Sequence, residues 1–148
     1  MSDFLGIDTS NYTTSAAIYE SHHNVLLQEK MLLPVKKGEK GIRQSDAVFP
    51  HTVQLPEIID KLFKKTGKRD ISAVGVSYAP RRLEGSYMPC FLTGISAATA
   101  VSRALSVPLY RFSHQEGHIA AALYSAGRLE LLNEPFIAFH VSGGTTEA

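Results

Sequence analysis

Apolar and polar positions along the chain follow two periods, one typical of strands and the other of helices. Near the N-terminus, short apolar or alternating runs predict three strands, and His22-His23-Asn24 predicts a hairpin turn between the last two. Apolar positions three or four residues apart then predict helices. The predicted strands are Phe4–Ile7, Thr13–Tyr19, Val25–Leu33, Ala73–Tyr78, Pro108–Arg111 and Phe136–Val141, and the predicted helices are Asp46–Thr66, Phe91–Leu105 and one that starts at His114. Three antiparallel strands followed by alternating helices and strands predict an α/β fold with a mixed sheet.

Composition is that of an ordinary globular domain. The chain has 148 residues, of which 44% are hydrophobic and 20% charged. A formal net charge of +1 gives no global basic field for nucleic acid, and the one local basic segment, Val35–Arg43, is most simply a solvated loop. A lone cysteine, no signal peptide and no apolar run of membrane-spanning length lead us to expect a cytoplasmic protein without a membrane partner.

Two segments of the chain share a pattern. Leu5–Ala16 and Ala138–Ala148 each read as a strand, a turn of small or hydroxyl residues, Thr-Thr and a small residue. An echo spaced a domain apart suggests a duplicated lobe. We therefore expect residues 1–135 to form a first lobe and residues 136–148 to be the first strand and turn of a truncated second lobe.

Two histidines, His114 and His118, lie four residues apart at the start of a predicted helix. They are ~40° apart around the helix, so they either converge on one metal ion or remain two partly exposed helix residues. A third ligand would have to come from elsewhere. Glu116 lies ~200° from His114, unlike the glutamate of the metalloprotease pattern His-Glu-x-x-His. Ser113-His-Gln-Glu116 instead fits a capping box, which predicts a structural role for Glu116 and disfavours a protease.

A polar turn after the first strand is a candidate phosphate or nucleotide loop. Asp8, Thr9, Ser10 and Asn11 offer backbone amides, hydroxyls and one carboxylate. Such a turn can cradle phosphates while the aspartate holds magnesium through water. An ordinary polar β-turn has the same appearance, so both interpretations stay open.

A second candidate segment begins in the last predicted strand. It comprises His140, Val141, Ser142, Gly143 and Gly144. The adjacent glycines allow a ligand to approach the backbone closely, although a tight hairpin explains them equally well. His140 by itself is expected to be a core or lining residue.

The loop after the strand Ala73–Tyr78 carries Arg81 and Arg82, at the carboxyl end of a strand where open α/β sheets bind ligands. The arginines suit a phosphate or carboxylate, or else form surface salt bridges. Cys90 is interpreted as a buried small hydrophobe, since no paired base lies nearby in the sequence. His51 is expected to open the long helix.

The order of these motifs resembles the tRNA threonylcarbamoyladenosine transferase (TsaD-like) family, also known as the O-sialoglycoprotein endopeptidase or glycoprotease family. The resemblance spans nearly the whole chain, and its most specific part is the His114/His118 pair followed by Phe139-His-Val-Ser-Gly-Gly144. The other matching motifs are Gly6-Ile-Asp-Thr-Ser10, Pro50-His-Thr-Val-Gln-Leu-Pro56, Gly94-Ile-Ser-Ala-Ala98 and the Thr-Thr that follows Gly144.

The resemblance implies an actin-like ATPase (ribonuclease H-like) fold of two duplicated lobes. It implies transfer of a threonylcarbamoyl group from threonylcarbamoyl-AMP to an adenosine beside the tRNA anticodon. His114 and His118 would bind one divalent metal, iron or zinc, with an aspartate of the second lobe, and the segment from His140 to Gly144 would contact the acyl-adenylate. Magnesium with an ATP-like nucleotide and an actin-like paralogue as a subunit are further expectations.

Three departures from the family pattern indicate a divergent paralogue. Glu-Thr-Ser-Cys-Asp-Glu reads Asp8-Thr-Ser-Asn-Tyr-Thr13 here, Gly-Pro-Gly-Leu reads Ala79-Pro-Arg-Arg-Leu83, and Gly-Gly-His-Thr reads Gly143-Gly-Thr-Thr146. The predicted metal ligands are retained while the loops on the nucleotide side differ. We expect an acyltransferase whose isolated N-terminal half is inactive, and the alternative is a non-catalytic actin-like protein that binds nucleotide or partner subunits.

Overall fold

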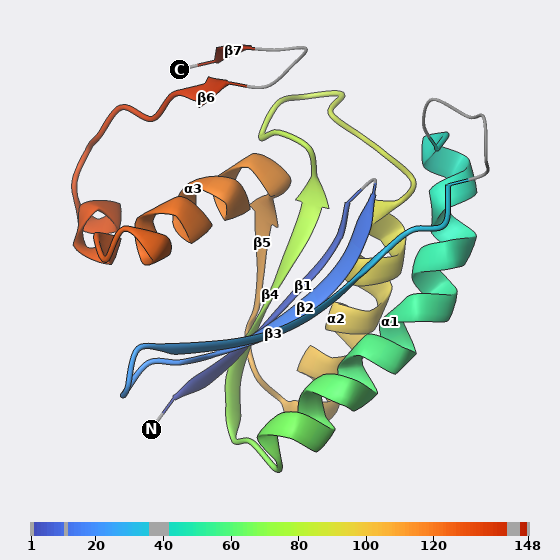
Figure 1. Cartoon of the computed structure of the whole chain (residues 1–148), viewed down its shortest axis with the longest axis horizontal. Helices are drawn as coiled ribbons and strands as arrows, with labels where there is room; N and C mark the ends of the chain where they lie inside the picture. The colour runs from blue at the N-terminus through green and yellow to red at the C-terminus, as the bar shows by residue number, and fades with distance from the viewer. Residues whose placement is uncertain (1, 11, 36–41, 142–145, 148) are drawn as a thin grey trace. The chain divides into compact units, whose positions relative to one another are not determined.

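A computed structural model describes residues 2–10, 12–35, 42–141 and 146–147 of the chain (Figure 1). By compactness it divides into two units, Met1–His114 and Gln115–Ala148, and each is described by itself. The division predicted after residue 135 concerns a second lobe and stays a prediction.

The first unit is built on a five-stranded mixed sheet in the order β3-β2-β1-β4-β5. The strands β1, β2 and β3 pair antiparallel, and β4 and β5 lie parallel to β1. The predicted meander is therefore confirmed, and each strand was found within a few residues of its predicted bounds. The strands are β1 (Asp3–Ser10), β2 (Thr13–Glu20), β3 (Val25–Leu32), β4 (Ile71–Ala79) and β5 (Leu109–Ser113).

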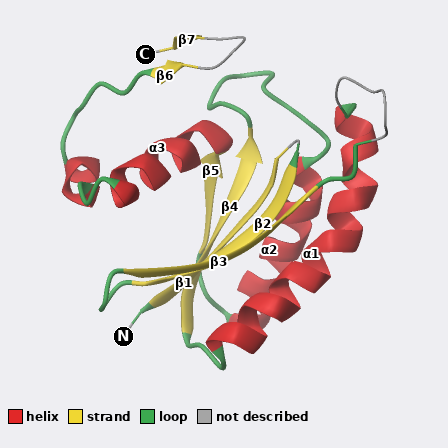
Figure 2. Cartoon of the chain, in the orientation of Figure 1, coloured by secondary structure: helices red, strands yellow, loops and turns green. Residues whose placement is uncertain are grey.

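Two helices cover one face of this sheet (Figure 2). Helix α1 (Gln44–Thr66) contacts β2 and β3, and helix α2 (Phe91–Leu105) contacts β1 and β4. The small residues Gly94, Ala98 and Ser102 recur every fourth position on the buried side of α2, which lets this helix approach the sheet closely. The predicted bounds of α2 are confirmed residue for residue.

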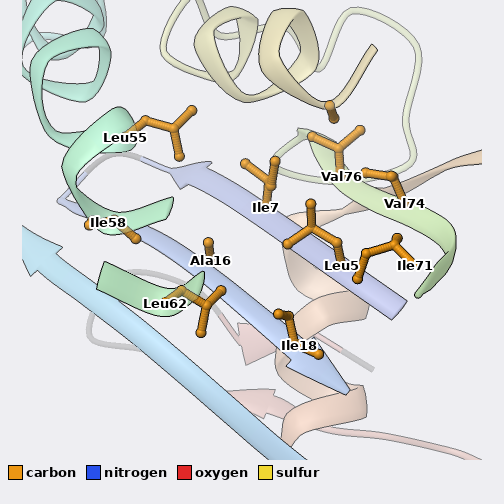
Figure 3. Packing of buried hydrophobic residues seen from close by; sticks show 11 residues of the cluster. Leu5, Ile7, Ala16, Ile18, Leu55, Ile58, Leu62, Ile71, Val74 and Val76 are labelled. Carbon is orange, nitrogen blue, oxygen red and sulfur yellow. The ribbon is translucent and has the colours of Figure 1, made fainter. Parts of the chain in front are cut away.

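The core lies between the helices and the sheet (Figure 3). Leu5 and Ile7 of β1 alternate with residues of the opposite face, and Val74 and Val76 of β4 do the same beside them. Helix α1 contributes residues at helical spacing, which the sequence pattern predicted. The buried cluster consists of Leu5, Ile7, Ala16, Ile18, Leu55, Ile58, Leu62, Ile71, Val74, Val76 and Ala98.

Helix α1 starts earlier than the sequence predicted. It begins at Gln44, so His51 lies two turns inside the helix and does not open it. The reason is packing upstream of Pro50, because Ala47 is fully buried in a second cluster with Leu33 and Phe91. The helix continues through both Pro50 and Pro56, each of which removes one backbone hydrogen bond.

The second unit contains most of helix α3 (His114–Ser125), a short 3-10 helix (Leu129–Asn133) and the two-residue strands β6 (His140–Val141) and β7 (Thr146–Glu147). The predicted start of α3 at His114 is confirmed. The predicted strand Phe136–Val141 is wrong in length, because only its last two residues find a ladder partner among the described residues. None of the described helices is long and apolar enough to cross a membrane.

Candidate functional site

The candidate site of the first unit lies where the parallel strands β1, β4 and β5 end. Asp8 follows Ile7, whose partner on β4 is Val76, and Ser77 is the next residue of β4. His114 follows directly after Ser113, the last residue of β5. The carboxyl ends of neighbouring parallel strands meet at one edge of the sheet, and this edge is the usual ligand site of open α/β sheets.

The Asp8 carboxylate is at the centre of this site. Its Oδ2 accepts hydrogen bonds from His114 Nδ1 at 2.8 Å and from the Ser77 hydroxyl at 2.5 Å. Its Oδ1 accepts one from the backbone N–H of Ser10 at 2.7 Å. Both oxygens are therefore held, and one carboxylate joins the ends of all the parallel strands.

The charge state of Asp8 determines which ring nitrogen of His114 carries the proton. Burial by itself raises the pKa of Asp8, but the hydrogen bonds and charge of His114, with those from Ser77 and Ser10, outweigh it and hold the pKa at about 2. An ionised carboxylate can only accept, so His114 Nδ1 is the donor. In the neutral imidazole, Nε2 then carries the lone pair.

Thr9 faces the opposite side of β1 and binds this strand to α2. Its buried hydroxyl donates to the carbonyl of Cys90 at 2.9 Å and accepts the backbone N–H of Gly94 at 3.1 Å. The Cys90 side chain is fully buried, as predicted, and burial raises the pKa of its thiol to about 11. Cys90 is therefore a neutral core thiol at physiological pH.

A buried polar network, which the sequence analysis missed, joins α1 to the meander. Gln54 donates through Nε2 to the carbonyl of Leu32 at 2.9 Å, so its Oε1 accepts the Thr14 hydroxyl at 2.8 Å. The same hydroxyl oxygen then accepts from His51 Nδ1 at 2.7 Å. His51 and Gln54 lie on the core face of α1, and a buried His at helical spacing with core leucines was the signal that could have found them.

In the second unit, His118 of α3 and His140 of β6 lie with their ring centroids 6.0 Å apart. The Nδ1 atom of His140 is buried and makes no hydrogen bond within the part of the chain that the structure describes. His140 as a whole is half-buried, and the expectation that it is a core or lining residue stays a prediction. His118 follows His114 by one helical turn in α3.

The other predicted site residues lie in β1, in the loop after β4 or outside the described residues. Ser10 lies at the end of β1, within a strand and not in the predicted turn, because β1 pairs with β2 as far as Ser10 and Thr13. Arg81 and Arg82 are exposed in the loop after β4. Asn11 and the segment Ser142, Gly143 and Gly144 lie outside the described residues. The start of α3 agrees with the capping box, whose hydrogen bonds stay a prediction.

The sequence predicted that His114 and His118 bind a metal ion. No group of three or more His, Cys, Asp or Glu side chains that could hold a metal occurs among the described residues. His114 nevertheless makes the hydrogen bond that metal-bound histidines usually make, from the ring nitrogen away from the metal to a carboxylate. Two imidazoles are ligands that iron and zinc accept, and a third ligand would have to come from elsewhere, so the metal site stays a prediction.

Comparison with known proteins identifies the family. Residues 24–148 match the family described as tRNA N6-adenosine threonylcarbamoyltransferase (TsaD). The chain belongs to this threonylcarbamoyltransferase family. Proteins of that name from Rhizobium johnstonii and Bacillus subtilis are 31% and 32% identical to it, with 97% of this chain aligned in both cases. The chain spans only 39% and 40% of the length of these two threonylcarbamoyltransferases.

Solved structures show the fold of this family member. YeaZ from Pseudomonas aeruginosa superimposes with a TM-score of 0.62 over 86% of this chain and 50% of that protein, at 17% identity. An uncharacterized protein described as similar to peptidase YeaZ from the same organism gives a TM-score of 0.56 over 76% of this chain and 44% of its own, at 18% identity. The α/β fold with an actin-like lobe is therefore confirmed for this threonylcarbamoyltransferase relative.

Proposed function

We propose that the protein carrying this chain transfers a threonylcarbamoyl group from threonylcarbamoyl-AMP to the adenosine next to the tRNA anticodon. Family membership over residues 24–148 supports the reaction class. The observation that carries the proposal to particular residues is the hydrogen bond from His114 to Asp8 at the carboxyl ends of the parallel strands.

We assign the metal of this reaction, iron or zinc, to His114 and His118. Both belong to α3 and are separated by about one helical turn, which suits two ligands of one ion. A bound divalent ion supplies Lewis acidity and a template for carbonyl and phosphate oxygens. This chemistry suits acyl transfer without a protein nucleophile, and Cys90, a buried neutral thiol, is no candidate for that role.

The remaining site residues have proposed roles in substrate binding. The segment from His140 to Gly144 would contact the acyl-adenylate, and Arg81 and Arg82 would attract its phosphate. The end of β1 from Asp8 to Asn11 would lie beside a nucleotide with magnesium. For Thr9 this role would be through the backbone only, since its hydroxyl is bound to α2.

Partner and domain proposals follow from the part of the family that this chain covers. Because the chain spans about two fifths of its relatives, we propose that a second lobe completes the site and that these 148 residues alone do not catalyse transfer. The proposed partners are tRNA, the acyl-adenylate and an actin-like paralogue, and the proposed location is the cytoplasm.

Elemental analysis of the protein at its natural length separates this function from a non-catalytic scaffold. The expected result is bound iron or zinc that is lost in His114→Ala and in His118→Ala. The exposed pair His22 and His23 provides the control, because His22→Ala should leave the metal content unchanged. Absence of metal in the wild type, or its retention in both α3 variants, would instead favour the scaffold that binds nucleotide or a partner.

A further inference from the structure

Asp8 accepts a hydrogen bond from His114, a residue far from it in the sequence. It is the only carboxylate between Phe4 and Tyr19, and it lies on the face of β1 opposite Leu5 and Ile7. That face is turned away from α1 and α2, whose contacts bury the leucine and isoleucine. The Asp8 side chain therefore points to the side on which His114 approaches it.

The Asp8 carboxylate is held by two hydrogen bonds besides the one from His114. Ser10 N–H occupies Oδ1 at 2.7 Å, and the Ser77 hydroxyl shares Oδ2 with His114. Ser10 holds the carboxylate through its backbone N–H and Ser77 through its side-chain hydroxyl, so groups from two adjacent strands of the sheet fix its position. Rotation of the His114 ring would break its hydrogen bond to Asp8, because the held carboxylate does not move with the ring.

We propose that Asp8 is a positioning residue that fixes the ring orientation and the Nδ1–H tautomer of His114, with Ser77 holding Asp8 in place. This inference rests on the proposed function, in which His114 ligates the metal. A histidine with Nδ1–H bound to a carboxylate presents Nε2 as the ligating nitrogen, and loss of such a carboxylate typically weakens metal binding ~10- to 100-fold. Asp8 thus acts through His114 and needs no contact with the metal itself.

Replacement of Asp8 by asparagine tests this role with almost no change in shape. The Ser10 N–H requires an acceptor, so it keeps the amide oxygen on its side and directs the amide nitrogen toward His114. That nitrogen is a donor, and it favours the opposite tautomer, with the proton on Nε2. The same change of tautomer is the accepted reason why a serine protease loses activity when its triad aspartate becomes asparagine.

The experiment uses the protein at its natural length, freed of metal and labelled with ¹⁵N at histidine. Long-range ¹H–¹⁵N spectra should show a protonated Nδ1 on His114 in the wild type and a protonated Nε2 in Asp8→Asn. Titration with Zn²⁺ should show affinity that is ~10- to 100-fold weaker in Asp8→Asn. Ser77→Ala keeps the carboxylate, so it should keep the wild-type tautomer and lose less affinity.

Asp3→Asn is the matched control. Asp3 lies in the same strand and is buried, but it accepts from Arg69 and not from a histidine. This variant should lose stability and leave both the His114 tautomer and the Zn²⁺ affinity unchanged.

The outcomes separate the inference from the proposed function. Unchanged tautomer and affinity in Asp8→Asn would overturn the positioning role, even with metal bound to the wild type. If the wild type binds no Zn²⁺ but the His114 tautomer still differs between wild type and Asp8→Asn, the metal assignment is contradicted and the positioning role is supported. If Asp8→Asn does not fold, the wild-type spectrum decides, because a protonated Nε2 there overturns the inference.

Discussion

Gly94 lies in the first turn of α2 against β1, and its replacement by alanine tests how closely the helix must approach the strand. An added Cβ would lie 2.9 Å from Thr9 Oγ1 and 3.5 Å from Ile7 Cγ2. Thr9 cannot move aside freely, because its hydroxyl donates to Cys90 and accepts from the Gly94 N–H. The substitution therefore forces either a displaced helix or the loss of this link.

The magnitude follows from three contributions to the free energy of unfolding. Overpacking of a close contact costs ~1–3 kcal/mol. A lost buried hydrogen bond adds ~1 kcal/mol, and the higher helix propensity of alanine recovers ~1 kcal/mol. We expect Gly94→Ala to lower the free energy of unfolding by about 1–3 kcal/mol.

Urea denaturation followed by circular dichroism measures this change. Gly117 provides the control, because it also lies in a helix but an added Cβ meets nothing within 4 Å. Gly117→Ala should leave the stability unchanged or raise it by up to ~1 kcal/mol. The double variant Gly94→Ala/Thr9→Ala should lose less free energy of unfolding than the two single variants lose together. Equal stability of Gly94→Ala and wild type would refute the close packing described for α2.

Three further predictions concern buried polar groups of the first unit. Thr14→Val should lower the free energy of unfolding by ~2 kcal/mol or more, because it leaves His51 Nδ1 and Gln54 Oε1 buried without a partner, whereas Thr14→Ser should stay close to wild type. Burial lowers the pKa of His51 from its ordinary 6.5, partly offset by the Ser10 backbone and the Asp8 charge. Below pH 6.5 the unfolded state binds a proton at His51 that the folded state does not bind. The free energy of unfolding should therefore decrease more steeply as the pH falls in wild type than in His51→Asn. Cys90 should resist alkylation by iodoacetamide at pH 8 in the folded protein and react in urea, and rapid modification of the folded protein would contradict its burial.

Some helices and strands could be predicted from the sequence more accurately than others. The bounds of α2 and the meander followed from local signals, namely small residues at helical spacing and alternation around a turn. The start of α1 was predicted two residues late, and the expectation that His51 opens this helix was wrong, because Pro50 resembles a helix start although it lies inside α1. The strand expected from Phe136 failed for a related reason, since strand formation depends on a pairing partner that local sequence does not reveal.

The candidate site shows the same limit. His114 and His118 were predicted as metal ligands from their spacing, which is a local property of a helix, and the structure confirms only that α3 begins at His114. Asp8 was predicted to lie in a turn that cradles phosphates and to hold magnesium through water, but its observed partner is His114, 106 residues later in the chain. That contact depends on the order of the strands β1, β4 and β5, which brings their carboxyl ends together. The Thr14–His51–Gln54 network was missed because the spacing of His51 with core leucines does not reveal its partner Thr14, which lies in β2 and meets α1 only when the helix packs on the sheet.

The most direct test of the proposed function is transfer to tRNA. The protein at its natural length, loaded with iron or zinc, is incubated with the actin-like paralogue, threonylcarbamoyl-AMP and tRNA that lacks the modification. The digested nucleosides are then examined by mass spectrometry. The proposal predicts N6-threonylcarbamoyladenosine in the wild-type reaction and its loss in His114→Ala. Unmodified adenosine in a metal-loaded wild-type reaction that includes the actin-like paralogue would contradict the proposed transfer.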